Sequence, residues 1–200
     1  MAAGIKFEST PPIEREVCDE KSLYRLTDGG MDLDMSNLPN KGWLPELTPI
    51  YRDKVEHKAV VCIRVKVVEK ATTGATTIKI AKCPFTDFIN VDTLLSDGTN
   101  VITVKSVDTS NEDYDTITTE EATKADLEVG KVLPEAKSAS DAKAKNVANF
   151  ASFGWRNLAK ENTVALVGRA YSIIEDNLYI PPFSLEGHFE KSRFHKSFTS

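Results

Sequence analysis

The sequence predicts a mostly β protein: a small β-barrel or sandwich core with a long irregular N-terminal arm and a C-terminal tail. Valine or isoleucine fills every second position over residues 61–68, the period of two expected of a half-buried strand. β-Branched runs recur over residues 77–81, 101–107 and 163–174, separated by turn signals such as Asp97-Gly98. Residues 61–68 and 77–81 are expected to pair as a hairpin. Short strands at this spacing are typical of a sandwich or barrel rather than of βαβ units.

The remaining strands follow from the same pattern. Residues 58–136 are predicted to form the β core, with short strands near residues 115–119 and 127–133. Pro134 is expected to end the second of these, because proline cannot donate to a ladder. Residues 151–182 are predicted to supply the closing strands of the same core.

Residues 1–57 are predicted to be an extended arm with one short helix. Breakers such as Pro11-Pro12 and Gly29-Gly30 interrupt the segment. The helix is expected over residues 13–24, since Ser9 and Thr10 can cap it. The arm also carries apolar residues that need a surface to pack on. We therefore predict an interface from this arm: Leu38, Trp43, Leu44, Leu47 and Tyr51.

Two further segments differ in composition from the core. Alanine, serine, lysine and aspartate dominate residues 137–150, which are predicted to be a linker or a weak exposed helix. Residues 183–200 are predicted to be a basic tail, in which Phe189 and Phe194 extend the candidate interface. The tail is opposite in charge to the acidic residues 108–128, and such charges can steer subunits together. On charge alone, two solvated surfaces are the favoured alternative.

The composition argues against several classes of partner. The chain has a net charge of -5 and a pI near 5.3, so neither nucleic acid nor an anionic membrane is expected to bind it. No stretch approaches the ~20 apolar residues of a membrane span, and the start lacks the pattern of a signal peptide. Cys18, Cys62 and Cys83 are expected to be structural thiols of a protein made in a reducing cytosol.

No catalytic, metal-ligating or cofactor-binding residue is predicted, and no cofactor is expected. The patterns of the phosphate-binding loop, the dinucleotide fingerprint and the serine nucleophile elbow all fail. His57, His188 and His195 have no partner at metal-ligand spacing. Residues 108–119 resemble the start of a calcium loop, but the glycine at its sixth position and the glutamate at its twelfth are missing.

The two tryptophans allow two interpretations. Trp43 and Trp155 can be platforms that stack on a sugar or a base, or residues packed on a core or interface. The second interpretation is favoured in an acidic β protein.

The predicted segments follow one another in an order that is itself informative. Between Trp43 and Pro182 come, in turn, Trp43-Leu44-Pro45 and residues 60–68, 75–80, 85–97, 107–111, 114–118, 127–133, 162–171 and 177–181. This order resembles head fibre and capsid decoration proteins of tailed phages, especially forms from Bacteroidetes hosts. The resemblance implies a virion location, attachment to the major capsid protein, frequent trimers at symmetry axes, and no catalytic residues. The basic tail after Pro182 departs from the family, whose chains often end near the last strand.

We therefore expect a structural virion protein, made in the host cytoplasm, that binds the major capsid protein as a homo-oligomer, with a trimer favoured. One alternative is another virion part, such as a tail, connector or cargo subunit. A second is a carbohydrate-binding module that uses Trp43, Trp155 or Tyr179. The least favoured alternative is an enzyme whose type the motifs do not identify.

Overall fold

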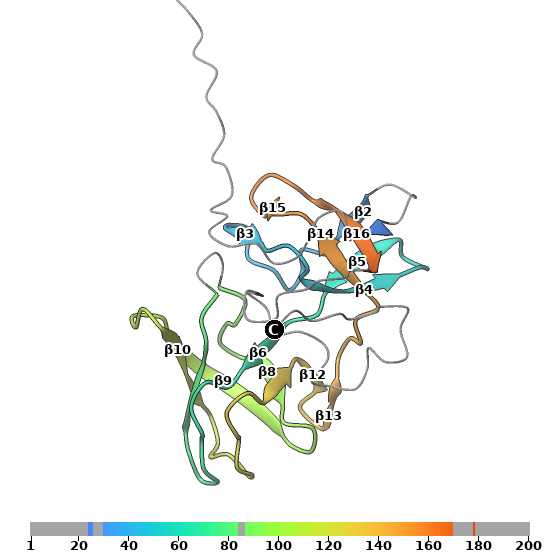
Figure 1. The fold of residues 1–200 in the computed structure, drawn as a ribbon. Coiled ribbons are helices and arrows are strands. Elements are labelled where there is room, and N and C mark those ends of the chain that lie inside the picture. The colour runs from blue at the N-terminus through green and yellow to red at the C-terminus, as the bar shows by residue number, and fades with distance from the viewer. Residues whose placement is uncertain (1–23, 26–29, 84–86, 170–177, 179–200) are drawn as a thin grey trace, which may run out of the picture.

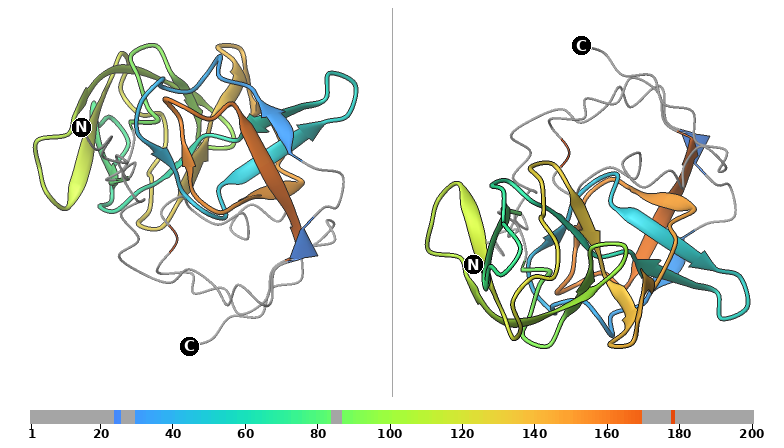
Figure 2. Two further views of the ribbon diagram at one scale, coloured as in Figure 1. Left: turned by 90° about the horizontal axis from the view of Figure 1, so that it is seen from above. Right: turned by 90° about the horizontal axis from the view of Figure 1, so that it is seen from below.

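The structure, a computed structural model, describes residues 24–25, 30–83, 87–169 and 178. Regular structure in these residues is entirely β, from β1 to β16 (Figure 1). The prediction of a mostly β protein with a small barrel is confirmed. The strands form two neighbouring units, which both views of Figure 2 show side by side.

The first unit, here called barrel A, is a closed five-stranded barrel. Its strands are ordered β16-β14-β4-β5-β2, and β2 pairs again with β16 to close the ring. Only the β2–β5 pair in this ring is parallel. Its strands are β2 (Met31–Leu33), β4 (Pro49–Asp53), β5 (Lys58–Val61), β14 (Phe150–Phe153) and β16 (Thr163–Arg169). Outside the ring, β1 (Tyr24–Arg25) pairs with β16, and β3 (Trp43–Leu44) pairs with β15 (Arg156–Asn157).

The second unit, here called the half-barrel, is built on a four-stranded antiparallel sheet ordered β7-β10-β9-β8. The sheet consists of β7 (Thr77–Ala81), β8 (Leu94–Ser96), β9 (Val101–Asp108) and β10 (Tyr114–Thr119). The unit also contains the strands β6 (Arg64–Lys66) and β11 (Val132–Pro134), which pair with each other. The β6–β11 pair adjoins both edges of this sheet, through single bridges at Val67–Ile80 and Leu95–Glu135. The predicted hairpin of residues 61–68 with 77–81 is therefore wrong beyond that one bridge, because β7 pairs with β10 instead.

A single hydrophobic core runs through both units. Leu44 and Leu166 of barrel A belong to the same buried cluster as Ile117 and Leu133 of the half-barrel. Residues 61–65 join the units and are buried without interruption. The single strand predicted here is split into β5 and β6, because β5 pairs with β4 of barrel A and β6 pairs with β11 of the half-barrel. Cys62, expected to be a structural thiol, is buried.

The N-terminal arm prediction is wrong for residues 30–57. These residues form β2, β3 and β4, and β2 and β4 are members of the closed ring. Tight turns separate these short strands: Gly42, just before β3, and Leu47, between β3 and β4, both have a positive φ, 85° and 57°. The helix predicted over residues 13–24 lies outside the described residues except for Tyr24, which belongs to β1.

The linker or helix predicted for residues 137–150 is also wrong. This segment contributes to β12 (Ala136–Ser138), forms β13 (Asp141–Ala144) and reaches the first residue of β14. β12 pairs with β13 as a ribbon that contacts β8. Of the alanines in residues 137–150, Ala148 is buried, Ala142 and Ala144 are partly buried, and Ala139 is exposed.

The turn predicted at Asp97-Gly98 connects β8 to β9. Gly98 has a φ of 97°, and the Asp97 carboxylate accepts bonds from the backbone N–H groups of Thr99 (2.7 Å) and Asn100 (2.6 Å). It also accepts one from the Asn100 side chain at 3.0 Å. Burial of the carboxyl acts to raise its pKa, but these hydrogen bonds outweigh burial and hold the Asp97 pKa below its ordinary value.

We expect Asp97→Ala to lower the free energy of unfolding by about 1 kcal/mol at pH 7, because two backbone donors lose their partner. The folded-state pKa lies below 3.8, so this contribution is complete above pH 3.8 and is lost as the pH falls through the folded-state value. Urea unfolding at pH 7 and at roughly pH 2.5 measures it. The exposed control Glu112→Ala should change stability by less than about 0.5 kcal/mol. An Asp97→Ala deficit of equal size at both pH values would contradict the assignment.

Candidate interaction surfaces

The described residues that were predicted to form an interface are either buried in the core or partly exposed. Leu44 and Leu47 are 0% and 6% exposed and belong to this protein's own core, so their assignment to an interface is wrong. Leu38 is partly buried and packs against the same core. The sequence shows that these residues need a partner, but that partner is barrel A itself.

Trp43 and Tyr51 keep part of their surface exposed. Trp43 lies in β3, opposite Asn157 of β15, whereas Tyr51 lies in β4, opposite Val60 of β5, and packs against Cys62 and Ala148. Figure 1 shows the strands β3 and β4 of this unit. The two residues therefore belong to different strand pairs. Phe189 and Phe194 lie outside the described residues.

The two tryptophans lie close to one strand pair. Trp43 belongs to β3, and Trp155 directly precedes β15, the strand that pairs with β3. The register sets Trp43 opposite Asn157, so the pairing brings two aromatic residues from distant parts of the chain to one ribbon. Both are partly exposed.

Several valines are exposed, mostly in turns. They are Val55 (85%), Val129 (62%), Val91 (58%), Val147 (45%) and Val68 (37%). Scattered exposed valines are ordinary on a soluble surface, but two of these five border a hollow. Each hollow is described in turn.

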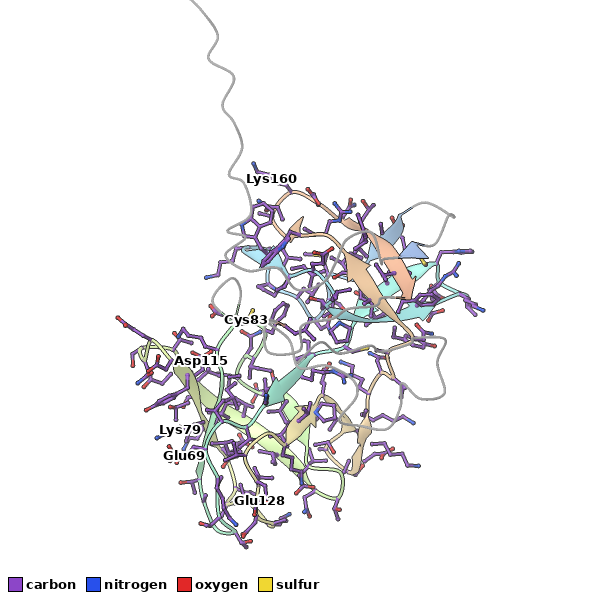
Figure 3. The ribbon with its side chains drawn as sticks, viewed as in Figure 1. Glu69, Lys79, Cys83, Asp115, Glu128 and Lys160 are labelled. Carbon is purple, nitrogen blue, oxygen red and sulfur yellow. The ribbon has the colours of Figure 1, made fainter. Side chains whose placement is uncertain are left out.

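The first hollow, here called the Val91 hollow, lies on the half-barrel and has a volume of about 300 Å³. Apolar side chains form much of its wall, and Asp87 and Asp115 stand among its polar residues. Figure 3 labels two of its residues, Cys83 and Asp115, at the end of the half-barrel nearer barrel A. Its lining includes Val65, Ile80, Cys83, Asp87, Phe88, Ile89, Val91, Val107, Thr109 and Asp115.

The second hollow, here called the Val147 hollow, has a volume of about 650 Å³ and lies between the β8–β9 turn and β13. Asp97 and Gly98 form one side, and Lys143 and Val147 the other. Its lining combines a turn glycine and small side chains with the charged side chains of Asp97, Lys131 and Lys143.

An internal cation organises the loop that resembles a calcium site. The Lys82 ammonium donates to the Asp115 carboxylate (2.7 Å) and to the backbone carbonyls of Thr109 (2.7 Å) and Asn111 (3.0 Å). These oxygens are the kind of ligand that calcium uses. Lys82, which directly follows β7, therefore places a positive charge among the oxygens of this loop.

We expect Lys82→Ala to lower the free energy of unfolding by about 2 kcal/mol, because it leaves a half-buried carboxylate and two carbonyls without their donor. The matched control is Lys124→Ala, whose ion pair with Glu121 is exposed and should contribute less than about 0.5 kcal/mol. Urea unfolding of both variants measures the difference. Equal effects would show that Lys82 has no organising role.

Several other charged side chains hold local structure. Backbone hydrogen bonds from Glu56 and Val55 lower the pKa of Asp53, and the backbone and hydroxyl of Thr73 lower that of Asp126. Glu69 pairs with Lys79 at 2.7 Å on the outer side of the half-barrel, where Figure 3 labels both. Exposed pairs of this kind contribute little to stability.

The described residues contain no group of three or more His, Cys, Asp or Glu residues placed to hold a metal ion. His57 is exposed in the β4–β5 turn with a φ of 55°, while His188 and His195 lie outside the part of the chain that is described. Cys62 is buried and Cys83 is partly buried. Across residues 24–25, 30–83, 87–169 and 178, no helix has the length and hydropathy needed to cross a membrane.

Comparison with known proteins gives no relative. No family model matches the chain, and no curated protein or solved structure matches it either.

Proposed function

We propose that this chain is a structural protein of a bacteriophage particle, a head fibre or auxiliary capsid protein that decorates the head and binds the major capsid protein. The order of segments between Trp43 and Pro182, which resembles such proteins, first suggests this role. The observation that carries it is architectural: two small β units share one core, and charged groups such as Lys82 and Asp126 hold turns and loops.

A shared core suits a protein that acts as a rigid building block. Residues 61–65 and the return through β12 to β14 link the units in both directions, so that neither can move without exposing buried surface. Many copies on a shell multiply modest individual contacts into stable attachment. A homotrimer is the assembly we favour, with the virion as its location.

Fewer residues are available for such contacts than the sequence indicates. Leu44 and Leu47 are withdrawn from the candidate interface because they are core residues. Trp43 and Tyr51 remain with part of their surface exposed, and Phe189 and Phe194 remain candidates from the sequence. The net charge of -5 continues to argue against nucleic acid as the partner.

The test is binding of terminal deletions to head shells that lack this protein. One variant removes residues 1–23 and the other removes residues 183–200. The first deletion stops before Tyr24, because a longer one ending at Pro39 would remove β1 and β2 and open barrel A. We expect at least one deletion to reduce co-sedimentation with shells by about tenfold or more, as loss of interface anchors does.

Each deletion variant is compared with the full chain by far-ultraviolet circular dichroism and thermal unfolding, so that misfolding is separated from loss of binding. The substitutions Phe189→Ser and Phe194→Ser repeat the test without removing chain. Unchanged binding by all four variants, or no binding of the full chain to any shell, would overturn the assignment of shell contacts to the termini.

A carbohydrate-binding module is the second candidate function. The observation in its favour is the β3–β15 ribbon, in which Trp43 lies opposite Asn157, and Asn157 is two residues from Trp155 in the sequence. Pairs of aromatic residues on one face can stack on sugar rings. A glycan-array signal that Trp43→Ala abolishes would favour this candidate over the structural role.

A further inference from the structure

The Val91 hollow has one wall that is held in a fixed conformation. Val91 lies in the turn between Asn90 and Thr93, where the Thr93 N–H donates to the Asn90 carbonyl (3.2 Å) and the Asn90 N–H to the Thr93 hydroxyl (3.1 Å). The Asp92 N–H donates to the Val104 carbonyl at 2.8 Å, and the φ of Asp92 is 67°. The turn is thus tied to β9, yet it leaves Val91 58% exposed at the rim.

The opposite wall is held in the same way. The Ser110 N–H donates to the Asp108 carboxylate at 3.0 Å, and the Asp113 N–H donates to the Asn111 side chain at 2.8 Å. Lys82 ties the carbonyls of this loop to Asp115. Two walls that are ordered before a ligand arrives lose little conformational entropy on binding.

The exposed charges around the hollow are mostly acidic. Asp87 lines the hollow, and the loop that contains its lining residue Thr109 carries exposed Asp108, Glu112 and Asp113. Arg64 also lines the hollow but is buried, and Lys82 is paired with Asp115. Apolar side chains of Phe88, Ile89 and Val91 line the interior. The matching ligand is therefore an aromatic or aliphatic side chain flanked by basic residues.

The chain carries a segment of this chemistry in its own C-terminal part. Residues 187–200 space Phe189, Phe194 and Phe198 among Lys191, Arg193 and Lys196. The residues after Leu178 can extend for up to about 70 Å, whereas a folded chain of this size is roughly 40 Å across. The segment is long enough to reach the hollow of its own molecule or of a neighbouring one.

We propose that the Val91 hollow is the receptor for residues 187–200 of this chain, with Phe194 among Phe88, Ile89 and Val91 and the basic residues against the acidic loop. The contact goes beyond the proposed function, because it involves two parts of this chain and no shell protein. It assigns Phe194 to the hollow and leaves Phe189 as the candidate shell contact of this segment. It gives the C-terminal segment a defined place to bind.

The test is photo-crosslinking in the full-length protein. Phe194 is replaced by the photoreactive amino acid p-benzoylphenylalanine, and cross-linked peptides are identified by mass spectrometry after irradiation. We expect attachment to residues 87–91 or 107–115. Attachment within one molecule and attachment between two molecules both support the proposal, and the mass of the product tells which occurs. The same probe at Val55, on barrel A, gives the background yield.

Two sets of variants make the test specific. Val91→Lys, and separately Glu112→Gln with Asp113→Asn, should reduce the cross-link yield by about tenfold or more. The matched control is Glu120→Gln with Glu121→Gln, two exposed acids after the other end of β10, and it should leave the yield unchanged. Cross-links elsewhere, a yield at the Val55 background, or no response to either set would overturn the proposal.

Discussion

Leu44→Ala is expected to lower the free energy of unfolding by about 2–5 kcal/mol, because Leu44 is fully buried and its loss leaves a cavity. That is a large part of the stability of an ordinary domain. The sequence alone suggests a residue that docks on a neighbour, whereas the structure places it in barrel A's own core. Urea unfolding of the isolated chain at several protein concentrations separates these alternatives.

The matched control for Leu44→Ala is Val55→Ala, in a hairpin turn and 85% exposed, which should change stability by less than about 0.5 kcal/mol. The Leu44→Ala loss should also be the same at every protein concentration, because the contacts removed are intramolecular. A normal unfolding midpoint combined with loss of self-association would instead restore Leu44 to an interface.

Leu133→Ala, in β11 of the half-barrel, is expected to lower the free energy of unfolding by a similar amount, about 2–5 kcal/mol. It is also expected to destabilise barrel A. Both tryptophans lie with the β3–β15 ribbon beside barrel A, so tryptophan fluorescence reports the unfolding of that unit. Because one core runs through both units, Leu133→Ala should shift the fluorescence midpoint as much as the midpoint from circular dichroism.

Two separate transitions would contradict a shared core. In that case Leu133→Ala would lower only the transition seen by circular dichroism, and the tryptophan signal would keep its original midpoint. The exposed Val129→Ala, in the turn before β11, is the matched control and should leave both signals unchanged.

The strands that the sequence predicts well are those with regular alternation and β-branched residues. β7 begins and ends where the run Thr77–Ala81 does, and β9 and β10 differ from their predicted bounds by one residue. Their side chains alone specify an inner and an outer face. The segment 61–68 misleads because its first five residues are buried without interruption as they cross between the units, and periodicity carries no information about which strand each part pairs with.

The strands that the sequence misses are short and owe their conformation to distant partners. The Thr48 N–H donates to the Ser152 hydroxyl, which in turn donates to the carbonyl of Pro45. All the polar atoms of this connection are buried, and the two segments lie more than a hundred residues apart. Tertiary contacts of this kind override the local preference of proline- and glycine-rich chain for turns. The arm prediction fails for the same reason.

The candidate surfaces also combine features that can be predicted from the sequence with features that only the fold reveals. The acidic loop and the basic tail can be identified from composition, and so can the resemblance of residues 108–119 to a calcium loop. Lys82 is 27 residues away from Thr109, so only the fold reveals that it fills that loop. Val91 is one valine among many in the sequence, and its exposure depends on how its turn is tied to β9.

The most direct test of the structural role is quantitative mass spectrometry of particles purified from lysates of the native host by density-gradient centrifugation. The account predicts that this chain bands with the particles in a fixed copy ratio to the major capsid protein, and that the ratio is unchanged by a second gradient. Recovery of the chain only in the soluble fraction, with none in the banded particles, would contradict it.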